Sequence, residues 1–495
     1  MKTNFNKTFE GMKIIVVMIF LMFFPKISYN QSNNSVSRQF NQFLNKSENI
    51  SSAISFGVYD LKKDSLIFGH NLMMAVSPAS TMKLFTTALA YEKLGSHYTV
   101  NTKLMHDGDI DSNGILNGNL WIVGAGDPTL GSKYFEKKDE QALFLNEWVN
   151  IIQSFGIKAI NGNIIGDASN FDYLGAPEGW NYGDLGNYYG AGPSGLTVFD
   201  NLLNLYFDVP SEQNEPATIS CMAPYIPGLE HITNVTAAPI KYDNTYIFGA
   251  PFGLDRYAIG SLPRSSEDFI VKSSIPDPEL LIAQELTIVL NESIPVSGIP
   301  LNVRKYQNLK QTNEPLKLIH EHPSKTVHSI AYWTNMRSVN LYAEHLLNMV
   351  ESKQRGTAST RTANILSENF WRNIVGNGIT INDGSGLSRK NGASAEHFCR
   401  LLMHVSKQNY YDNFVQTLPV AGKSGTLSSI CRNQAAQGRI KAKSGTMSKI
   451  KSYAGYVETK NNQQLVFSIS INNHQFSSSQ LKKEIELIFN SMVNL

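Results

Sequence analysis

Cysteine is scarce in this chain of 495 residues, which has only Cys221, Cys399 and Cys431. Three cysteines so far apart exclude a disulfide framework, and their spacing is not that of a metal site. The eleven histidines are scattered as well. The closest pair, His320 and His322, fits alternation along a strand better than metal binding. We therefore expect neither a metal nor a cofactor.

An excess of charge of one sign is also missing. The formal net charge is +2, and without residues 1–30, which hold four lysines and one glutamate, it is about −1. A near-neutral surface disfavours nucleic acid or a polybasic membrane contact as the main partner. The longest apolar run, Ile14–Phe24, is too short for a stable membrane span but typical of a signal-peptide core.

We predict that residues 1–30 are a signal peptide and that the protein is exported, to the periplasm or another extracytoplasmic space. An uncleaved N-terminal anchor is the alternative, because Ser28-Tyr29-Asn30 lacks the usual small-x-small cleavage pattern. We expect membrane association to be peripheral at most, or to occur through the N-terminal segment if it is not cleaved. The mature length of about 465 residues predicts two or more domains.

The rest of the chain changes character twice. Residues 54–69 alternate around a turn and predict an antiparallel hairpin. From about 97 to 315, short β-like runs with frequent Gly, Asn and Pro predominate, with helices expected near 139–154 and 278–291. From about 316 the chain is expected to be helical, and it then ends in strands and a closing helix. The expected late elements are helices at 326–349, 360–375 and 393–405, strands at 440–446, 453–458 and 465–471, and a last helix at 480–489.

This order predicts an α/β (α+β) domain that is discontinuous in sequence. If the N-terminal hairpin and the C-terminal strands share one sheet, residues 31–96 and 316–495 form one catalytic domain. Residues 97–315 would then be a large β-rich insertion of two subdomains.

The segment Ser77–Tyr91 combines a turn, an apolar helix and a reactive pair. Ser80 is expected at the helix start, and Lys83 follows one helical turn later on the same face. A buried lysine with a lowered pKa can take a serine proton and so make the serine nucleophilic. The same spacing recurs at Ser448, beside a predicted strand, and at Ser479, the expected N-cap of the closing helix.

Two further motifs follow in the chain. Ser338-Val-Asn340 brings a hydroxyl and an amide to the loop that opens the apolar helical stretch Leu341–Val350. Lys443-Ser444-Gly445 lies on a predicted strand, where the glycine is expected to let a ligand backbone approach the strand edge. A second Lys-Ser-Gly, Lys423–Gly425, follows a loop and is expected to be structural.

The ordered set Ser-x-x-Lys, Ser-x-Asn and Lys-Ser-Gly resembles that of the penicillin-recognising serine acyltransferases. With about 250 residues between Ser80 and Ser338, the chain looks like the class C low-molecular-mass penicillin-binding proteins, the D-alanyl-D-alanine carboxypeptidase/endopeptidases. Ser444 and Val339 stand where Thr and Asp are commoner. The likeness runs from about residue 40 to 472, and its supporting stretches are Val123–Leu130, Tyr189–Ser194, Asp383–Arg389 and Leu418–Gly422.

The resemblance implies a transpeptidase-like fold and a serine D-Ala-D-Ala carboxypeptidase, with or without DD-endopeptidase activity. Its partners would be peptidoglycan stem peptides and β-lactams, which would acylate it. A β-lactamase is one alternative, although the large insertion counts against it. A catalytically inactive peptidoglycan-binding protein is the other.

The resemblance also implies a role for each residue of the motifs. Ser80 would attack the D-Ala-D-Ala carbonyl, Lys83 would be the general base, and Ser338 would relay the proton to the leaving D-alanine. Asn340 would hold the amide of the acyl chain, and Lys443 would supply positive charge near the terminal carboxylate.

The implied substrate-binding residues continue along the last motif. Ser444 would offer a hydroxyl to the carboxylate, and the backbone N–H groups of Ser80 and Thr446 would form the oxyanion hole. The remaining implied contacts are Gly445, and Arg389 and Met447 in a pocket for the substrate side chain. From the residues themselves, we expect burial to lower the Lys83 pKa, and Lys443, nearer solvent, to stay charged and lower it further.

Overall fold

The two ends of the chain share one antiparallel sheet. The computed structural model describes residues 34–305 and 315–495, so the predicted signal peptide lies outside the described residues. The sheet has the order β17-β18-β19-β1-β2, and β1 pairs with β19 along its whole length. The strands are β1 (Ala53–Asp60), β2 (Ser65–His70), β17 (Ile440–Met447), β18 (Ile450–Glu458) and β19 (Gln464–Asn472).

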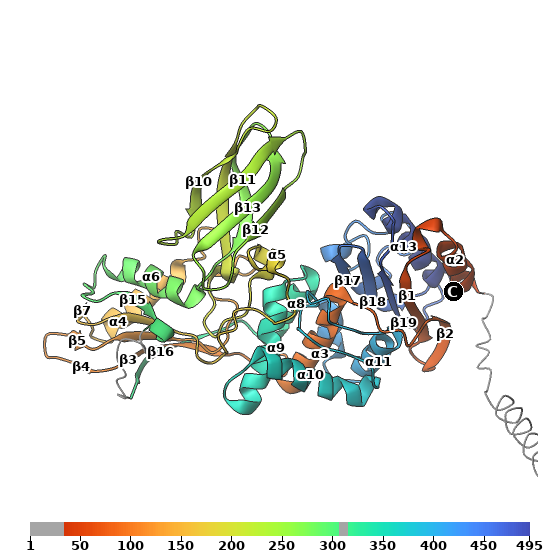
Figure 1. Cartoon of the computed structure of the whole chain (residues 1–495). Helices are drawn as coiled ribbons and strands as arrows, with labels where there is room; N and C mark the ends of the chain where they lie inside the picture. The colour runs from red at the N-terminus through yellow and green to blue at the C-terminus, as the bar shows by residue number, and fades with distance from the viewer. Residues whose placement is uncertain (1–33, 306–314) are drawn as a thin grey trace, which may run out of the picture.

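Helices cover both faces of this sheet (Figure 1). One face packs against α2 (Ser35–Leu44) and α13 (Ser478–Val493), with Phe40, Phe43 and Ile485 fully buried between them. The expected closing helix is confirmed, but its N-cap is Ser477, whose hydroxyl accepts from the Gln480 N–H, and not Ser479. The capping oxygen must precede the first turn, and the helix begins earlier than its apolar pattern suggests.

The other face carries a layer of helices, formed by residues 83–93 and by the helices that follow residue 326. Its apolar core is continuous, because α9 packs against α3, α8 and α10, and α11 packs on the sheet. The helices are α3 (Lys83–Lys93), α8 (Val327–Met336), α9 (Asn340–Arg355), α10 (Thr360–Val375), α11 (Ala395–Val405) and α12 (Tyr411–Gln416).

The β-rich region contains a second five-stranded sheet with the order β15-β8-β6-β3-β16, and a small sheet β4-β5-β7. Two helices pack against it and around Trp148, which is fully buried. The elements are β3 (Asn101–His106), β4 (Asp109–Ile110), β5 (Ile115–Asn117), β6 (Leu120–Val123), α4 (Leu143–Ser154), β7 (Ala159–Ile160), β8 (Ile164–Asp167), α6 (Pro278–Leu290), β15 (Pro300–Asn302) and β16 (Lys317–Pro323).

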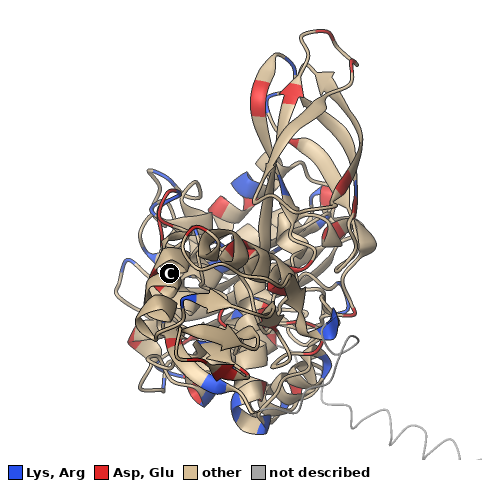
Figure 2. Ribbon diagram, turned by 90° about the vertical axis from the view of Figure 1, so that its left-hand side faces the viewer, with Lys and Arg blue, Asp and Glu red and all other residues tan. Residues whose placement is uncertain are grey.

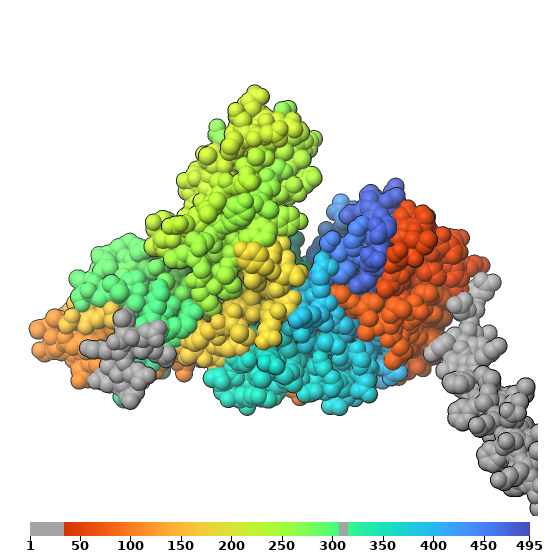
Figure 3. Space-filling model, viewed as in Figure 1, coloured from red at the N-terminus to blue at the C-terminus, as the bar shows by residue number. Residues whose placement is uncertain are grey.

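A projecting pair of three-stranded sheets, which we call the fin, is formed by residues 202–274. In Figure 3 an open cleft separates the fin from the C-terminal part of the chain, with α5 (Tyr182–Leu185) at its base. The sheets have the orders β10-β9-β14 and β11-β13-β12. The strands are β9 (Leu202–Val209), β10 (Thr218–Ala223), β11 (Glu230–Ala238), β12 (Asn244–Phe248), β13 (Asp255–Pro263) and β14 (Ser266–Ser274).

The structure differs from the sequence expectation at one border. Residues 317–323 were expected to begin the helical part, but they form β16, which pairs antiparallel with β3 of the inserted sheet. The pattern there alternates, as noted for His320 and His322, and the helices begin only at Val327. The division of the chain into a catalytic domain of residues 31–96 and 316–495 and an insertion of residues 97–315 stays a prediction.

Basic and acidic positions are interspersed along the ribbon in Figure 2. Among residues 34–305 and 315–495, no helix has the length and apolar character that a membrane crossing requires. All three cysteines are free, with Cys399 and Cys431 buried and Cys221 exposed.

Candidate active site

Ser80 lies in a 3₁₀ turn, Ala79–Met82, that leads directly into α3. The turn is tight, because Ala79 has a φ of +48°, a left-handed conformation that is uncommon for a residue with a Cβ. Lys83 is the first residue of α3, and its Nζ is 3.1 Å from the Ser80 Oγ. The Ser-x-x-Lys spacing therefore places the two groups as the sequence predicts.

Lys83 is enclosed by other polar groups. Its Nζ donates to the Asn340 Oδ1 at 2.6 Å and to the Ser385 carbonyl at 2.6 Å. The side chain is fully buried. Burial lowers the Lys83 pKa to about 7, although the negative charges of Asp383 and Glu344 act to raise it. At neutral pH this amine is therefore divided between its neutral and charged forms.

Glu344 is a site residue that sequence reasoning missed. It lies on α9 one turn after Asn340, fully buried, and accepts from the backbone N–H of Gly384 at 3.1 Å and of Ser385 at 2.7 Å. Burial, together with the negative charge of Asp383, raises its pKa to about 8. A carboxylate on the buried side of an apolar helix is the signal that could have revealed it.

The loop at Asp383, noted in the sequence only as a supporting stretch, holds the carbonyl that faces Lys83. Asp383 accepts from the Trp180 indole at 2.7 Å and from the backbone N–H of Gly386 at 2.7 Å. Gly386 has a φ of +83°, and a Cβ there would collide with the Ala79 carbonyl. The glycine thus allows this loop to close against the Ser80 turn.

Ser338 and Lys443 form a second hydroxyl–amine pair. Ser338 occupies the junction between α8 and α9 with a φ of +61°. The Lys443 Nζ donates to its Oγ at 3.0 Å and to the Ser444 carbonyl at 2.7 Å. The motifs at Ser80, Ser338 and Lys443 therefore meet, as their order in the chain predicts.

The expectation that Lys443 lies nearer solvent is wrong. Its side chain is fully buried, because the Ser80 turn and the Ser338 junction cover this end of β17. Burial lowers the Lys443 pKa well below its usual value, and the positive charge of Lys83 lowers it further. Burial is thus the largest cause of the lowered pKa of both lysines.

Gly445 lies where the Ser80 turn approaches β17. A Cβ there would collide with the Ser452 hydroxyl and would lie 2.7 Å from the Pro78 carbonyl and 2.9 Å from the Ser80 N. The absence of a side chain at this position therefore allows the close approach of Ser80 to the strand. The predicted approach of a ligand backbone at this glycine stays a prediction.

The second Lys-Ser-Gly segment supports the first. The Ser444 Oγ donates to the Thr426 Oγ1 at 2.8 Å, and Thr426 follows directly after Gly425. Lys423 itself is exposed. The segment is structural, as expected, but Thr426 contacts a predicted substrate-binding residue, which sequence reasoning missed.

A cavity of about 440 Å³ opens onto Ser80. Five other predicted residues line it together with Ser80, namely Ser338, Asn340, Arg389, Thr446 and Met447. Ser448, noted in the sequence only for its Ser-x-x-Lys spacing, lines it as well and follows Met447 in the turn to β18. Its partner by spacing, Lys451, donates instead to the Thr446 Oγ1 at 2.7 Å.

The inserted region supplies one wall of this cavity. Asn181, Asp184, Tyr189 and Tyr246 line it, and the Asn340 Nδ2 donates to the Tyr189 carbonyl at 2.8 Å. Burial raises the Asp184 pKa, while the charge of Arg389 acts to lower it. Tyr189 was noted in the sequence only as the start of a supporting stretch. The other three residues were not predicted, because their distance in sequence from the motifs leaves no spacing signal.

The sequence profile described as the D-Ala-D-Ala carboxypeptidase 3 (S13) family matches residues 36–491. The chain belongs to this family. Among curated relatives, it is 27% identical over 420 residues to a D-alanyl-D-alanine carboxypeptidase of an Actinomadura species, with 80% of this chain and 73% of the relative covered. It is 24% identical over 457 residues to such a carboxypeptidase of Haemophilus influenzae, covering 87% and 88%.

The fold of this carboxypeptidase is that of a solved relative. The crystal structure of penicillin binding protein 4 from Haemophilus influenzae superposes with a TM-score of 0.78 at 21% identity, over 93% of this chain and 98% of the other. The predicted penicillin-recognising α/β fold with a large β-rich insertion is confirmed. So is the predicted activity, a serine-type D-Ala-D-Ala carboxypeptidase, and neither alternative function is favoured.

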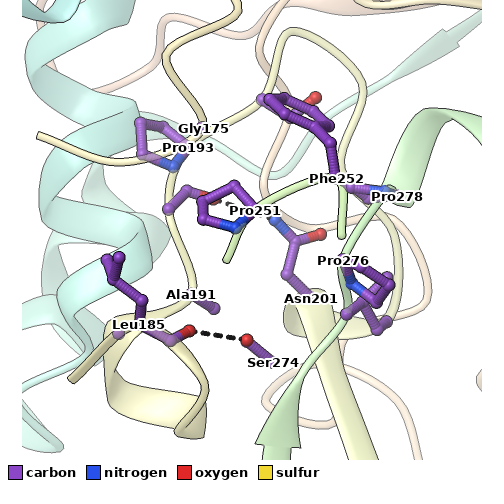
Figure 4. Close-up of a pocket in the computed structure, with 14 residues that line it drawn as sticks. Gly175, Leu185, Ala191, Pro193, Asn201, Pro251, Phe252, Ser274, Pro276 and Pro278 are labelled. Carbon is purple, nitrogen blue, oxygen red and sulfur yellow. Dashed lines mark hydrogen bonds between the residues drawn. The ribbon is translucent and has the colours of Figure 1, made fainter. Parts of the chain in front are cut away.

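A second, smaller cavity of the carboxypeptidase lies behind α5 and is no candidate site. Figure 4 shows prolines 193, 251, 276 and 278 around it, and the Ser274 hydroxyl donating to the Leu185 carbonyl. No Asp, Glu, Lys, Arg, His or Cys lines it. Leu185, the last residue of α5, lines it, and the preceding residue, Asp184, lines the cavity at Ser80.

Proposed function

We propose that Ser80 is the nucleophile of this carboxypeptidase and Lys83 its general base. The observation that carries the proposal is the 3.1 Å contact between the Ser80 Oγ and a fully buried amine whose pKa is lowered to about 7. A neutral Lys83 accepts the hydroxyl proton while Ser80 attacks the carbonyl carbon of the D-Ala-D-Ala bond. The product is an acyl-enzyme, which water then hydrolyses.

The second pair delivers a proton to the leaving group. Ser338 lies at the cavity with its Oγ 3.0 Å from the Lys443 Nζ, so it can give its proton to the departing amine and recover one from Lys443. A leaving D-alanine carries a carboxylate. Its negative charge favours the charged form of Lys443 and so offsets the effect of burial when substrate is bound.

The substrate backbone is proposed to lie along β17. This strand is at the edge of its sheet, and Thr446 and Met447 face the cavity. An extended peptide can add to such an edge as a further strand. The N–H groups of Ser80 and Thr446 would then stabilise the oxyanion, the Asn340 amide would hold the acyl chain, and Ser444 would lie near the terminal carboxylate.

The side chain of the acyl residue is proposed to enter the region of Arg389 and Met447. Asp184 lines the same cavity, and its pKa responds to the charge of Arg389. A pocket with one group of each sign suits a side chain that ends in both an ammonium and a carboxylate. We propose that Arg389 binds the carboxylate and Asp184 the ammonium.

β-Lactams are the proposed inhibitors, and the stem peptides of peptidoglycan the substrates. A second solved structure of the Haemophilus influenzae protein, with a TM-score of 0.73, is described as a complex with a β-lactam. An enzyme that acts on peptidoglycan must meet it outside the cytoplasm. This requirement supports the predicted export to the periplasm or another extracytoplasmic space.

A labelled penicillin tests this proposal. Purified protein should form a covalent adduct that persists for minutes or longer and should release D-alanine from a peptide ending in D-Ala-D-Ala. A β-lactamase would turn the label over, and an inactive binding protein would form no adduct. A cross-linked stem-peptide dimer, assayed in parallel, shows whether endopeptidase activity accompanies carboxypeptidase activity. An adduct on a residue other than Ser80 would overturn the assignment.

A further inference from the structure

One face of the fin, together with α5 at its base, carries a row of exposed aromatic side chains. The aromatic row consists of Tyr182, Tyr246, Phe248 and Tyr257, and Ile232 extends it. The exposed fractions are 63% for Tyr182, 53% for Tyr246, 41% for Tyr257 and 63% for Ile232. Large apolar side chains that gather on one exposed face mark a binding surface more often than scattered ones do.

The strand register places these side chains on one face. Tyr246 and Phe248 are two apart on β12, so they point the same way. Phe248 pairs with Tyr257 on β13, and Tyr257 pairs with Ile232 on β11. The ring centroids of Tyr182 and Phe248 are 5.4 Å apart, and those of Phe248 and Tyr257 are 6.5 Å apart. The row thus crosses all three strands of the sheet.

The aromatic row is continuous with the catalytic cavity. Tyr246 belongs to both, since it lines the cavity together with Ser80. Tyr182 lies on α5 between Asn181 and Asp184, two further residues of the cavity wall. A substrate held at Ser80 and too large for the cavity would therefore meet the row where it leaves the cavity, beside the open cleft seen in Figure 3.

The face is poor in charge. The strands β11, β12 and β13 carry Glu230, Asp255 and Arg256 as their Asp, Glu, Lys and Arg residues, and Arg256 is 1% exposed. Glu230 and Asp255 pair with each other two residues before Ile232 and Tyr257, so the exposed charges on these strands are two carboxylates beside the far end of the row. An anionic polymer would require basic residues here, so the row suits a neutral ligand with apolar faces.

We infer that the aromatic row binds the glycan part of peptidoglycan while the stem peptide occupies the cavity. This inference rests on the proposed function. A pyranose ring presents C–H groups on its faces, and these pack on the electron-rich faces of aromatic rings. In a stem peptide the sugar is attached at the end opposite to D-Ala-D-Ala. A few extended residues of roughly 3.3 Å each separate the two, and this matches a surface that begins at the cavity wall.

The test compares two substrates that differ only in the sugar. One is a free stem pentapeptide ending in D-Ala-D-Ala, and the other is the same peptide carrying its disaccharide. Tyr257→Ser and Ile232→Ser alter the end of the row farthest from the cavity. Leu318→Ser on β16 removes a side chain of similar exposure, 48%, from another sheet and is the matched control.

We expect the wild-type protein to show the lower KM for the disaccharide peptide. Tyr257→Ser and Ile232→Ser should raise that KM about fivefold and leave kcat/KM for the free peptide unchanged, because one stacking contact contributes on the order of 1 kcal/mol. Leu318→Ser should change neither. Thermal unfolding of each variant shows whether it is folded.

Three results would overturn the inference. One is equal KM values of the wild-type protein for the two substrates. Another is an equal loss of activity on both substrates in the folded row variants, which would assign the row to the peptide. The third is a wild-type dimer that Tyr257→Ser converts to a monomer, which would make the row an interface between copies. Failure of the proposed function is distinct, because the free peptide would then not be hydrolysed at all.

Discussion

The pH dependence of acylation follows from the burial of Lys83. An ordinary lysine titrates near about 10.4, so at pH 7 roughly one in 2500 is neutral. With a pKa of about 7, half of the Lys83 side chains are neutral at that pH. The second-order rate of acylation by a labelled penicillin reports groups of the free enzyme. It should rise about tenfold per pH unit below pH 7 and level off above it.

Glu344→Gln provides the perturbation. The carboxylate raises the Lys83 pKa, so its removal should move the ascending limb to lower pH. Glu344 has a raised pKa of about 8, and the two groups therefore titrate close together. The ascending limb of the wild-type profile belongs to the pair, whereas that of the variant reports Lys83 with Asp383 as its remaining negative neighbour. A wild-type limb near pH 10, or a limb that moves to higher pH in Glu344→Gln, would refute Lys83 as the base.

Three further substitutions test the site. Ser80→Ala should abolish covalent penicillin labelling, whereas Ser479→Ala, on the surface helix, should leave it intact. Lys443→Ala should slow acylation at least about tenfold, which corresponds to about 1.4 kcal/mol less stabilisation of the transition state. Lys423 is exposed, so Lys423→Ala should react at nearly the wild-type rate. Equal losses in the two variants would contradict the assignment. Gly445→Ala should lower the acylation rate, because its Cβ would displace the Ser80 turn. It should also lower the free energy of unfolding by about 1–3 kcal/mol. A normal acylation rate would show that the distance between the Ser80 turn and β17 is not critical.

The sequence predicted the residues that short motifs mark. Ser80 and Lys83 are one helical turn apart, so local geometry alone brings them together. The junction at Ser338 could be located because it opens an apolar helix. The hairpin at the start and the strands at the end were expected to form one sheet only if the two ends of the chain meet, and β1 does pair with β19.

Burial at the site could not be predicted, because it depends on parts of the chain that are far apart. On β17 the alternation places Lys441 and Lys443 on the same face, which suggests two solvated lysines. Lys441 is exposed, whereas Lys443 is covered by segments more than 100 residues away in sequence. Burial therefore lowers the Lys443 pKa well below the value expected of a solvated lysine.

The β-rich insertion is also connected to the side chains around Lys83. The amide of Asn340 accepts from Lys83 on one side and donates to the Tyr189 carbonyl on the other. Lys83, the proposed general base, and the inserted region are therefore linked through a single side chain. A shift of α5 and Tyr189 would withdraw the partner that fixes the Asn340 amide, and with it the oxygen that holds Lys83 against Ser80. A ligand on the fin could thus affect both the position of the substrate and the position of the base.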